Sequence, residues 1–161
     1  MVRTIRLDEP LWAPASRARR DDWRTTIVDL LDDGRLGHPQ HDELQVGLEG
    51  TDVSLRLLGG AAATETLTIP SGELAALIGE YLHVIRRMQD EDVSESGTKM
   101  QALDMAKKVV HDNGARVLAK AAPGVASTHE TYRRLFTLVL SVVVDVTALP
   151  GGKAHRRHAL A

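Results

Sequence analysis

Three short stretches of alternating apolar and polar residues constrain the fold of this chain more than any other feature. They read LQVGLE from Leu44, VSLRL from Val53 and TLTI from Thr66. A period of two places successive side chains on opposite faces, as in strands with one buried face. Because the links between them are short and contain glycine, neighbouring strands are predicted to pair antiparallel as a meander. The stretch VRTIRL near the N-terminus is a candidate fourth strand.

Four segments with helical periodicity are predicted to cover the buried face of this meander. They span about 21–34, 71–88, 98–121 and 128–147, and Ser127 is the expected N-cap of the last. Asn113 and Gly114 could end or kink the third helix, and a continuous or merely kinked helix is the expectation. The last helix is apolar almost all round and is predicted to be the most buried. The predicted fold is α+β, with a single domain over 1–149 and a flexible basic tail over 150–161.

The charges of the first long helix run against its dipole. Three arginines stand at or before its start and three aspartates near its end: Arg17, Arg19, Arg20, Asp29, Asp32 and Asp33. A helix dipole favours acids at the N-terminus and bases at the C-terminus, by about 0.3–1 kcal/mol each. Packing against another element, or a partner, must therefore hold this helix in place.

Composition excludes several classes of function. The chain has no cysteine, so it forms neither a disulfide framework nor a thiolate metal site, and its N-terminus lacks the apolar core of a secretory signal, so we expect a cytoplasmic protein. A net charge of -2 and an aromatic content of 3% make nucleic-acid binding an unfavoured hypothesis. The last helix is too short to span a membrane and contains Asp145. No phosphate-binding loop is present, and no cofactor is expected.

Two histidines, His38 and His41, form the motif HPQH, whose spacing occurs at metal sites. No HExxH motif accompanies it. We therefore expect an ordinary exposed loop and no metal.

The segment LDMAKKVVHDNGARVL, from Leu103 to Leu118, is the strongest candidate for chemistry. Asp104 and His111 project only about 20° apart on a helical wheel, with Lys107 and Lys108 beside them. The opposite side is apolar and holds Ala106, Val109, Val110, Asn113 and Val117. Pairs at i+3 and i+4 among these charged residues are typical of an ordinary solvated helix face.

A reactive site on this segment requires a second element. Asp104 and His111 are about 10 Å apart along the helix axis, too far for a direct hydrogen bond. The arginines of the next helix, Arg133 and Arg134, are the candidates to approach the same face. The sequence leaves two alternatives open, a solvated face or a site that these arginines complete.

The paired motifs LDMAKKVVHDNG and YRRLFTLVL resemble the C-terminal signature of the uncharacterised protein family 0262, small proteins found mainly in alphaproteobacteria. The order of elements upstream, from LDE at Leu7 to the helix ELAALIGEYLHVI, is similar as well. Here Lys107 and Lys108 stand where the family has arginines. The resemblance implies no activity, but it points to a working surface. Carried over residue by residue, the pattern falls on Asp104, Met105, Lys107, Lys108, His111, Gly114, Arg133, Arg134, Leu135, Phe136 and Thr137.

Two functions of different class follow. The first is a small non-enzymatic regulatory or adaptor protein that acts through protein contacts with a partner of unknown identity; the apolar last helix further suggests a homodimer. The second is a small enzyme or anion-binding domain in which His111, oriented by Asp104, works with Arg133 and Arg134. If these arginines and His111 face one concave site, the second function is favoured. We favour the first, because the sequence contains no complete catalytic constellation.

Overall fold

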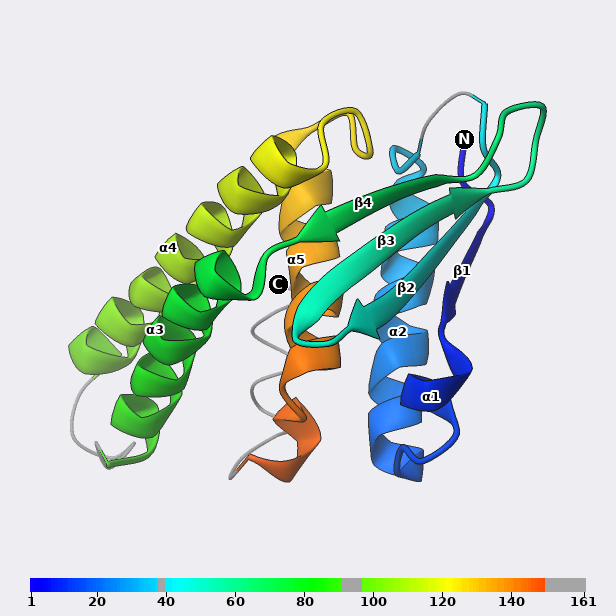
Figure 1. The fold of residues 1–161 in the computed structure, drawn as a ribbon. Helices are drawn as coiled ribbons and strands as arrows, with labels where there is room; N and C mark the ends of the chain where they lie inside the picture. Colours follow the sequence, from blue (N-terminus) through cyan, green and yellow to red (C-terminus); the bar gives the residue numbers. More distant parts are fainter. Residues whose placement is uncertain (38–39, 91–96, 150–161) are drawn as a thin grey trace.

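The computed structural model describes residues 1–37, 40–90 and 97–149 of the chain (Figure 1). The predicted tail over 150–161 lies outside the described residues. The elements are, in chain order, β1 (Thr4–Leu7), α1 (Glu9–Trp12), α2 (Arg17–Asp33), β2 (Glu43–Glu49), β3 (Asp52–Leu58), β4 (Glu65–Ile69), α3 (Ser71–Asp90), α4 (Gly97–Ala121), α5 (His129–Val143) and a short 3-10 turn, η1 (Val146–Ala148). None of the helices in these ranges is long and apolar enough to cross a membrane.

The four strands form one sheet in the order β1-β2-β3-β4. Strands β2, β3 and β4 pair antiparallel, which confirms the predicted meander. Strand β1 pairs parallel with β2, with Thr4 opposite Glu43 and Leu7 opposite Val46, so the sheet is mixed. The connection from β1 to β2 contains the whole of α2, and a crossover of this kind is what a parallel pair requires.

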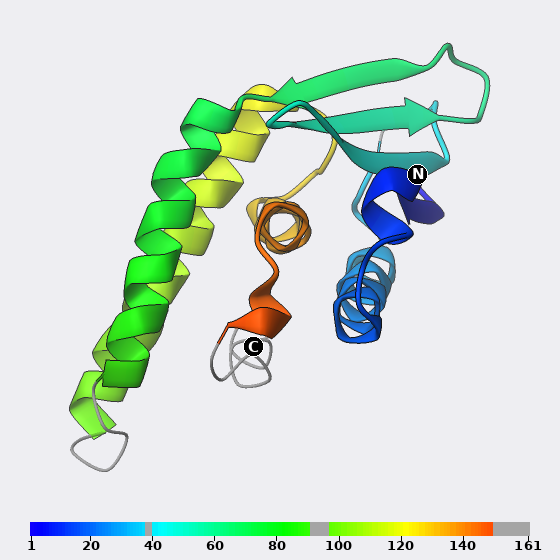
Figure 2. The same cartoon turned by 60° about the horizontal axis from the view of Figure 1, so that its bottom comes forward.

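The helices cover one face of the sheet, as Figure 2 shows from below. The side chains on that face are fully or almost fully buried, among them Ile5, Leu44, Leu55 and Ile69. The other face is polar, and one row across it contains Arg6, Gln45, Arg56 and Thr66. This arrangement is the one wet face expected of an antiparallel meander.

Helix α5 lies at the centre of the helical layer. It packs against α4 on one side and α2 on the other, and Phe136 in its middle has no exposed surface. The predicted buried helix is therefore confirmed, although it begins one residue later than expected, because the N-cap is Thr128 and not Ser127. It ends at Val143, about four residues earlier than expected, because Val144 takes an extended conformation and Asp145 then caps η1.

Helix α4 continues without interruption through Asn113 and Gly114. Gly114 is required there for close packing and not as a helix end. A Cβ atom built on Gly114 would lie 2.4 Å from Cγ and Cδ2 of Phe136. The bare backbone of α4 therefore rests directly against the aromatic ring of α5.

The reversed charges of α2 match the dipole of α5, since the two helices run antiparallel. Arg19, at the start of α2, donates from Nη2 to the carbonyl oxygens of Ser141 (3.1 Å) and Val142 (3.0 Å), at the end of α5. Asp33, at the end of α2, accepts a hydrogen bond from the hydroxyl of Thr131 in the first turn of α5. The arginine end of α2 thus stabilises the C-terminus of α5, and the aspartate end stabilises the N-terminus of α5. No partner is needed to explain the charge pattern.

Candidate functional site

The predicted site residues of α4 divide between the interior and the surface. Lys107 and His111 are buried, with 3% and 4% of their surface exposed, whereas Lys108 is exposed and Asp104 is half-buried. The interpretation of this segment as a solvated face is therefore wrong for Lys107 and His111. The reason is the position of α4, which packs against both α3 and α5 and buries the face that carries His111.

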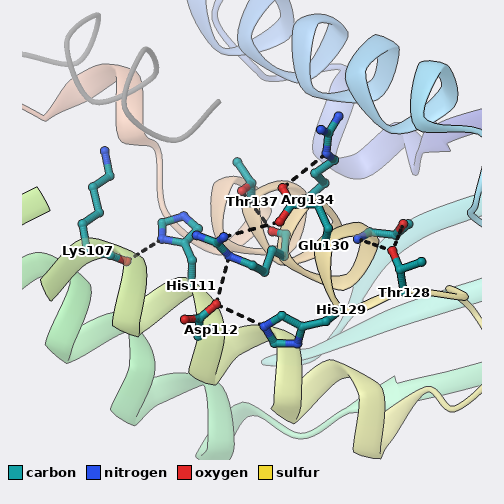
Figure 3. Close-up of polar contacts among 10 residues, drawn as sticks. Lys107, His111, Asp112, Thr128, His129, Glu130, Arg134 and Thr137 are labelled. Atoms are coloured by element: carbon teal, nitrogen blue, oxygen red, sulfur yellow. Dashed lines mark hydrogen bonds and ion pairs between the residues drawn. The ribbon is translucent and has the colours of Figure 1, made fainter. Parts of the chain in front are cut away.

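The imidazole of His111 lies between three helices (Figure 3). Its Nδ1 is 2.9 Å from the carbonyl oxygen of Lys107, and its ring meets the rings of Tyr81 and Phe136 edge-on, with centroids 5.8 and 5.5 Å away. Because a carbonyl only accepts, Nδ1 carries the proton of the neutral ring and Nε2 is left as an acceptor. Nε2 is buried and has no hydrogen-bond partner within residues 1–37, 40–90 and 97–149.

Burial dominates the electrostatics of this region. It lowers the pKa of His111, the positive charges of Lys107 and Arg133 lower it further, and the hydrogen bond to the Lys107 carbonyl opposes the shift. Burial also lowers the pKa of Lys107 to about 8, against the attraction of Asp104. Burial and the charge of Asp22 raise the pKa of Tyr81 to about 12. At neutral pH His111 is therefore uncharged.

The two predicted arginines point in different directions. Arg133 turns toward α4, where its Nε lies 3.1 Å from Oδ1 of Asp112, and its Nη1 lies 3.4 Å from Glu130. Arg134 turns toward α2 and donates to the carbonyl oxygen of Asp29 at 3.5 Å. Figure 3 shows Arg134 extending away from His111. The arrangement predicted for an anion clamp, with both arginines and His111 at one site, is thus not formed.

Asp112 accepts the contacts that hold the Arg133 side chain near His111. Its Oδ1 is 3.1 Å from Nε2 of His129, and this hydrogen bond, with the charge of Arg133, lowers the pKa of the Asp112 carboxyl. These side chains are partly exposed, between 27% and 50%, so their ion pairs contribute little to stability. They fix the orientation of Arg133 beside His111.

The HPQH motif is only partly described, because His38 lies outside the described residues. His41 is buried and its Nε2 is 2.9 Å from the carbonyl oxygen of Ala63, so the expectation of an exposed loop is wrong for this residue. Across the described part of the chain, no three histidine, aspartate or glutamate side chains gather closely enough to hold a metal ion.

A groove of about 470 Å³ opens on the opposite side of the helical layer, between β1, α1 and α2. Its apolar lining consists of Ile5, Leu7, Trp12, Ile27 and Val28. Three charged side chains, Arg6, Glu9 and Arg24, complete it. The volume lies within the range of ordinary ligand-binding clefts, about 300–1,000 Å³.

Aromatic and cation contacts hold the short helix α1 against α2 at one end of the groove. The Trp12 ring stacks on Trp23 of α2 at a centroid distance of 6.0 Å. The guanidinium groups of Arg20 and Arg24 lie 5.3 and 5.0 Å from the centroid of Trp12. Arg20 also donates from Nε to the Trp12 carbonyl oxygen at 2.9 Å. These contacts make the groove a built feature, not a gap between loose segments.

Sequence reasoning did not find this groove. One signal was present: Val28 is an apolar residue outside the helical period of Ile27, Leu30 and Leu31, and in the structure it is 53% exposed. Trp12, which closely follows Pro10 in the short segment EPLW, was a second signal. Neither pattern reveals a groove without the placement of α2 beside β1.

The fold defines the chain as a small α+β protein, in whose described residues the groove lies between the edge strand β1 and helix α2. The chain belongs to the uncharacterised protein family UPF0262, whose model matches residues 1–145. It is 25% identical to the UPF0262 protein of Acidiphilium cryptum over 147 residues, which cover 88% of this chain and 91% of that protein. It is 28% identical to the UPF0262 protein of Paracoccus denitrificans over 157 residues, covering 86% and 93%. No solved structure matches the chain.

Proposed function

We propose that this protein is a non-enzymatic adaptor or regulatory protein of the cytoplasm that binds a partner protein in the groove between β1, α1 and α2. The observation that carries the proposal is the groove itself, with an apolar floor, a charged rim and an open sheet edge along one side. Clefts that combine apolar walls with a few polar groups usually bind small ligands, and a free sheet edge beside such a cleft adds the main-chain hydrogen bonds that recognise an extended peptide.

A display experiment tests the proposal, with the full chain as bait and a library of random short peptides as probe. We expect enrichment of peptides whose affinity falls by about tenfold or more in the variant Val28→Glu, which places a charge in the groove wall. The matched control is Val109→Glu on α4, because Val109 is 52% exposed and Val28 53%. Failure to enrich any peptide, or equal binding to both variants, contradicts the proposal.

The alternative function, an anion-binding site at His111, has one observation in its favour. Nε2 of His111 is a buried acceptor with no hydrogen-bond partner in the described part of the chain. Against it, Arg134 points toward α2, and the Lys107 side chain extends away from the imidazole (Figure 3). Titration of the labelled protein with inorganic phosphate separates the functions: a saturable shift of the His111 ring signals supports the alternative, and unchanged signals contradict it.

The homodimer expected from the sequence also stays a prediction. Its original basis is weaker in the structure, since the apolar side chains of α5 are mostly covered by other parts of the chain. Apolar surface that a second copy could cover is found on α4, at Met105 (60% exposed) and Val109 (52% exposed). The variant Met105→Glu therefore reports on self-association.

A further inference from the structure

We propose that the groove receives an extended peptide segment of the partner protein, which adds to the free edge of β1 as a fifth strand and carries acidic side chains in alternation with apolar ones. This inference rests on the proposed function and specifies how the partner is recognised.

The free edge of β1 is the first observation. β1 stands at the end of the sheet, with β2 on one side. Thr4 donates its N–H to Asp42 (3.2 Å) and Asp8 donates to Val46 (2.9 Å), and in a parallel ladder only every second residue faces the partner strand. The N–H and C=O groups of the intervening residues, Ile5 and Leu7, therefore point to the opposite side. Among the described residues, no backbone group from another segment bonds to them there.

The position of the groove is the second observation. It is lined by β1 over residues 5–7 on one side and by Arg24, Ile27 and Val28 of α2 on the other. Neighbouring strands in a sheet are about 4.8 Å apart, so a strand added to β1 lies within this space. Figures 1 and 2 both place β1, α1 and α2 at the same side of the molecule. The groove thus offers a backbone edge and a side-chain wall, which is the geometry of strand addition.

The alternation of a strand predicts the sequence of the partner segment. Side chains of the added strand that point toward the helices meet Trp12, Ile27 and Val28 and are therefore apolar. Side chains that point the other way lie beside Arg6, which projects from the polar face of the sheet. Cross-strand pairs of opposite charge stabilise a sheet, so these positions favour Asp or Glu.

The charged rim supports an acidic partner. Two guanidinium groups, of Arg6 and Arg24, and one carboxylate, of Glu9, line the groove. Arg6 is paired with Glu43 and Arg24 with Asp21, but both arginine side chains are more than half exposed. Exposed pairs of this kind are weak, so the guanidinium groups can exchange their partners for those of an incoming segment.

The same charges disfavour two other occupants. A second copy that paired its β1 antiparallel with this one, with Ile5 opposite Leu7, would place Arg6 opposite Arg6, and like charges in that position are destabilising. The sequence over 150–161 contains Lys153, Arg156 and Arg157 and carries the same sign of charge as the rim.

Backbone substitution of an enriched peptide tests strand addition separately from groove binding. Peptides N-methylated at one position at a time are titrated into the full chain. We expect affinity losses of about tenfold or more at alternate positions and little change between them, because only every second N–H of an added strand faces β1. Arg6→Glu should weaken acidic peptides and leave those with the acids replaced by glutamine unaffected.

Each outcome of this experiment has a distinct meaning. Tolerance of N-methylation at all positions, with binding still lost in Val28→Glu, overturns strand addition but leaves the proposed function standing. Peptides that bind Val28→Glu as well as the parent overturn both. If deletion of residues 150–161 raises the affinity for the peptide, the tail of the chain itself occupies the groove. If light scattering shows that a dimer dissociates as the peptide binds, a second copy occupies the groove. Either result overturns the inference.

Discussion

Replacement of Gly114 by alanine tests the packing on which the helical layer depends. Its Cβ would lie 2.4 Å from two carbon atoms of the Phe136 ring, and both residues are buried in the core. Overpacking of this kind costs about 1–3 kcal/mol, and the close contact with ring atoms favours the upper part of that range. Alanine has a higher helix propensity than glycine, which offsets about 1 kcal/mol of this cost. We therefore expect Gly114→Ala to lower the free energy of unfolding by about 1–2 kcal/mol.

The matched control is Gly79→Ala in α3, where an added Cβ meets nothing within 4 Å. That variant should gain about 1 kcal/mol from helix propensity alone, so the two alanine variants should differ by about 2–3 kcal/mol in urea unfolding. Combining Gly114→Ala with Phe136→Leu removes the ring and should recover part of the loss, as a coupling in a double-mutant cycle. If Gly114→Ala is stabilised as much as Gly79→Ala, α4 and α5 do not approach as described.

Three further predictions concern the interior and one concerns association. Phe136→Ala should lower the free energy of unfolding by about 3–5 kcal/mol, measured by urea titration. Burial lowers the pKa of His111, so just below pH 6.5 the unfolded chain binds a proton that the folded chain does not. The free energy of unfolding should therefore fall as the pH drops below about 6.5, and it should fall less steeply in His111→Gln. Burial lowers the pKa of Lys107 to about 8, so its charge disfavours the folded state; in an Asp104→Asn background, where no carboxylate loses the attraction of Lys107, Lys107→Met should raise the urea midpoint. Light scattering should show a particle of twice 17.5 kDa, and a monomer at high concentration would contradict the homodimer.

The elements of this fold could largely be predicted from periodicity, but the pairing of β1 could not be read from its own four residues. Its parallel partner is separated from it by the whole of α2. A strand, a long helix and a strand in succession form a crossover unit, and this order was the available signal for a parallel pair. The meander that follows, with short glycine-containing links, left no such ambiguity.

The buried face of α4 was predicted only in part: Val110 of the predicted apolar side is buried, but hydropathy does not rank glycine or lysine as core residues. The helical wheel placed Val109 inside and His111 outside, whereas Val109 is 52% and His111 4% exposed. The buried stripe passes over Gly114, the position at which α4 can approach Phe136. The close approach of the two backbones buries the side chains on that stripe. Lys107 is one of them, and its aliphatic stem suits an apolar site.

The candidate site could be predicted only in part, since it depends on how separate elements meet. Sequence spacing identified His111 and Arg133, which lie on adjacent helices, but it could not show that Arg134 turns toward α2. The groove requires the free edge of β1 to face α2, and neither strand nor helix periodicity contains that information.

Amide hydrogen exchange of β1 tests the central claim most directly. In the free protein the Arg6 amide faces β2 and should be protected, whereas the Ile5 and Leu7 amides, on the free edge, should exchange rapidly. When an enriched acidic peptide saturates the groove, we predict that exchange at Ile5 and Leu7 slows while exchange at Arg6 remains as slow as before. Unchanged exchange at Ile5 and Leu7 in the saturated complex would contradict the addition of a strand to β1.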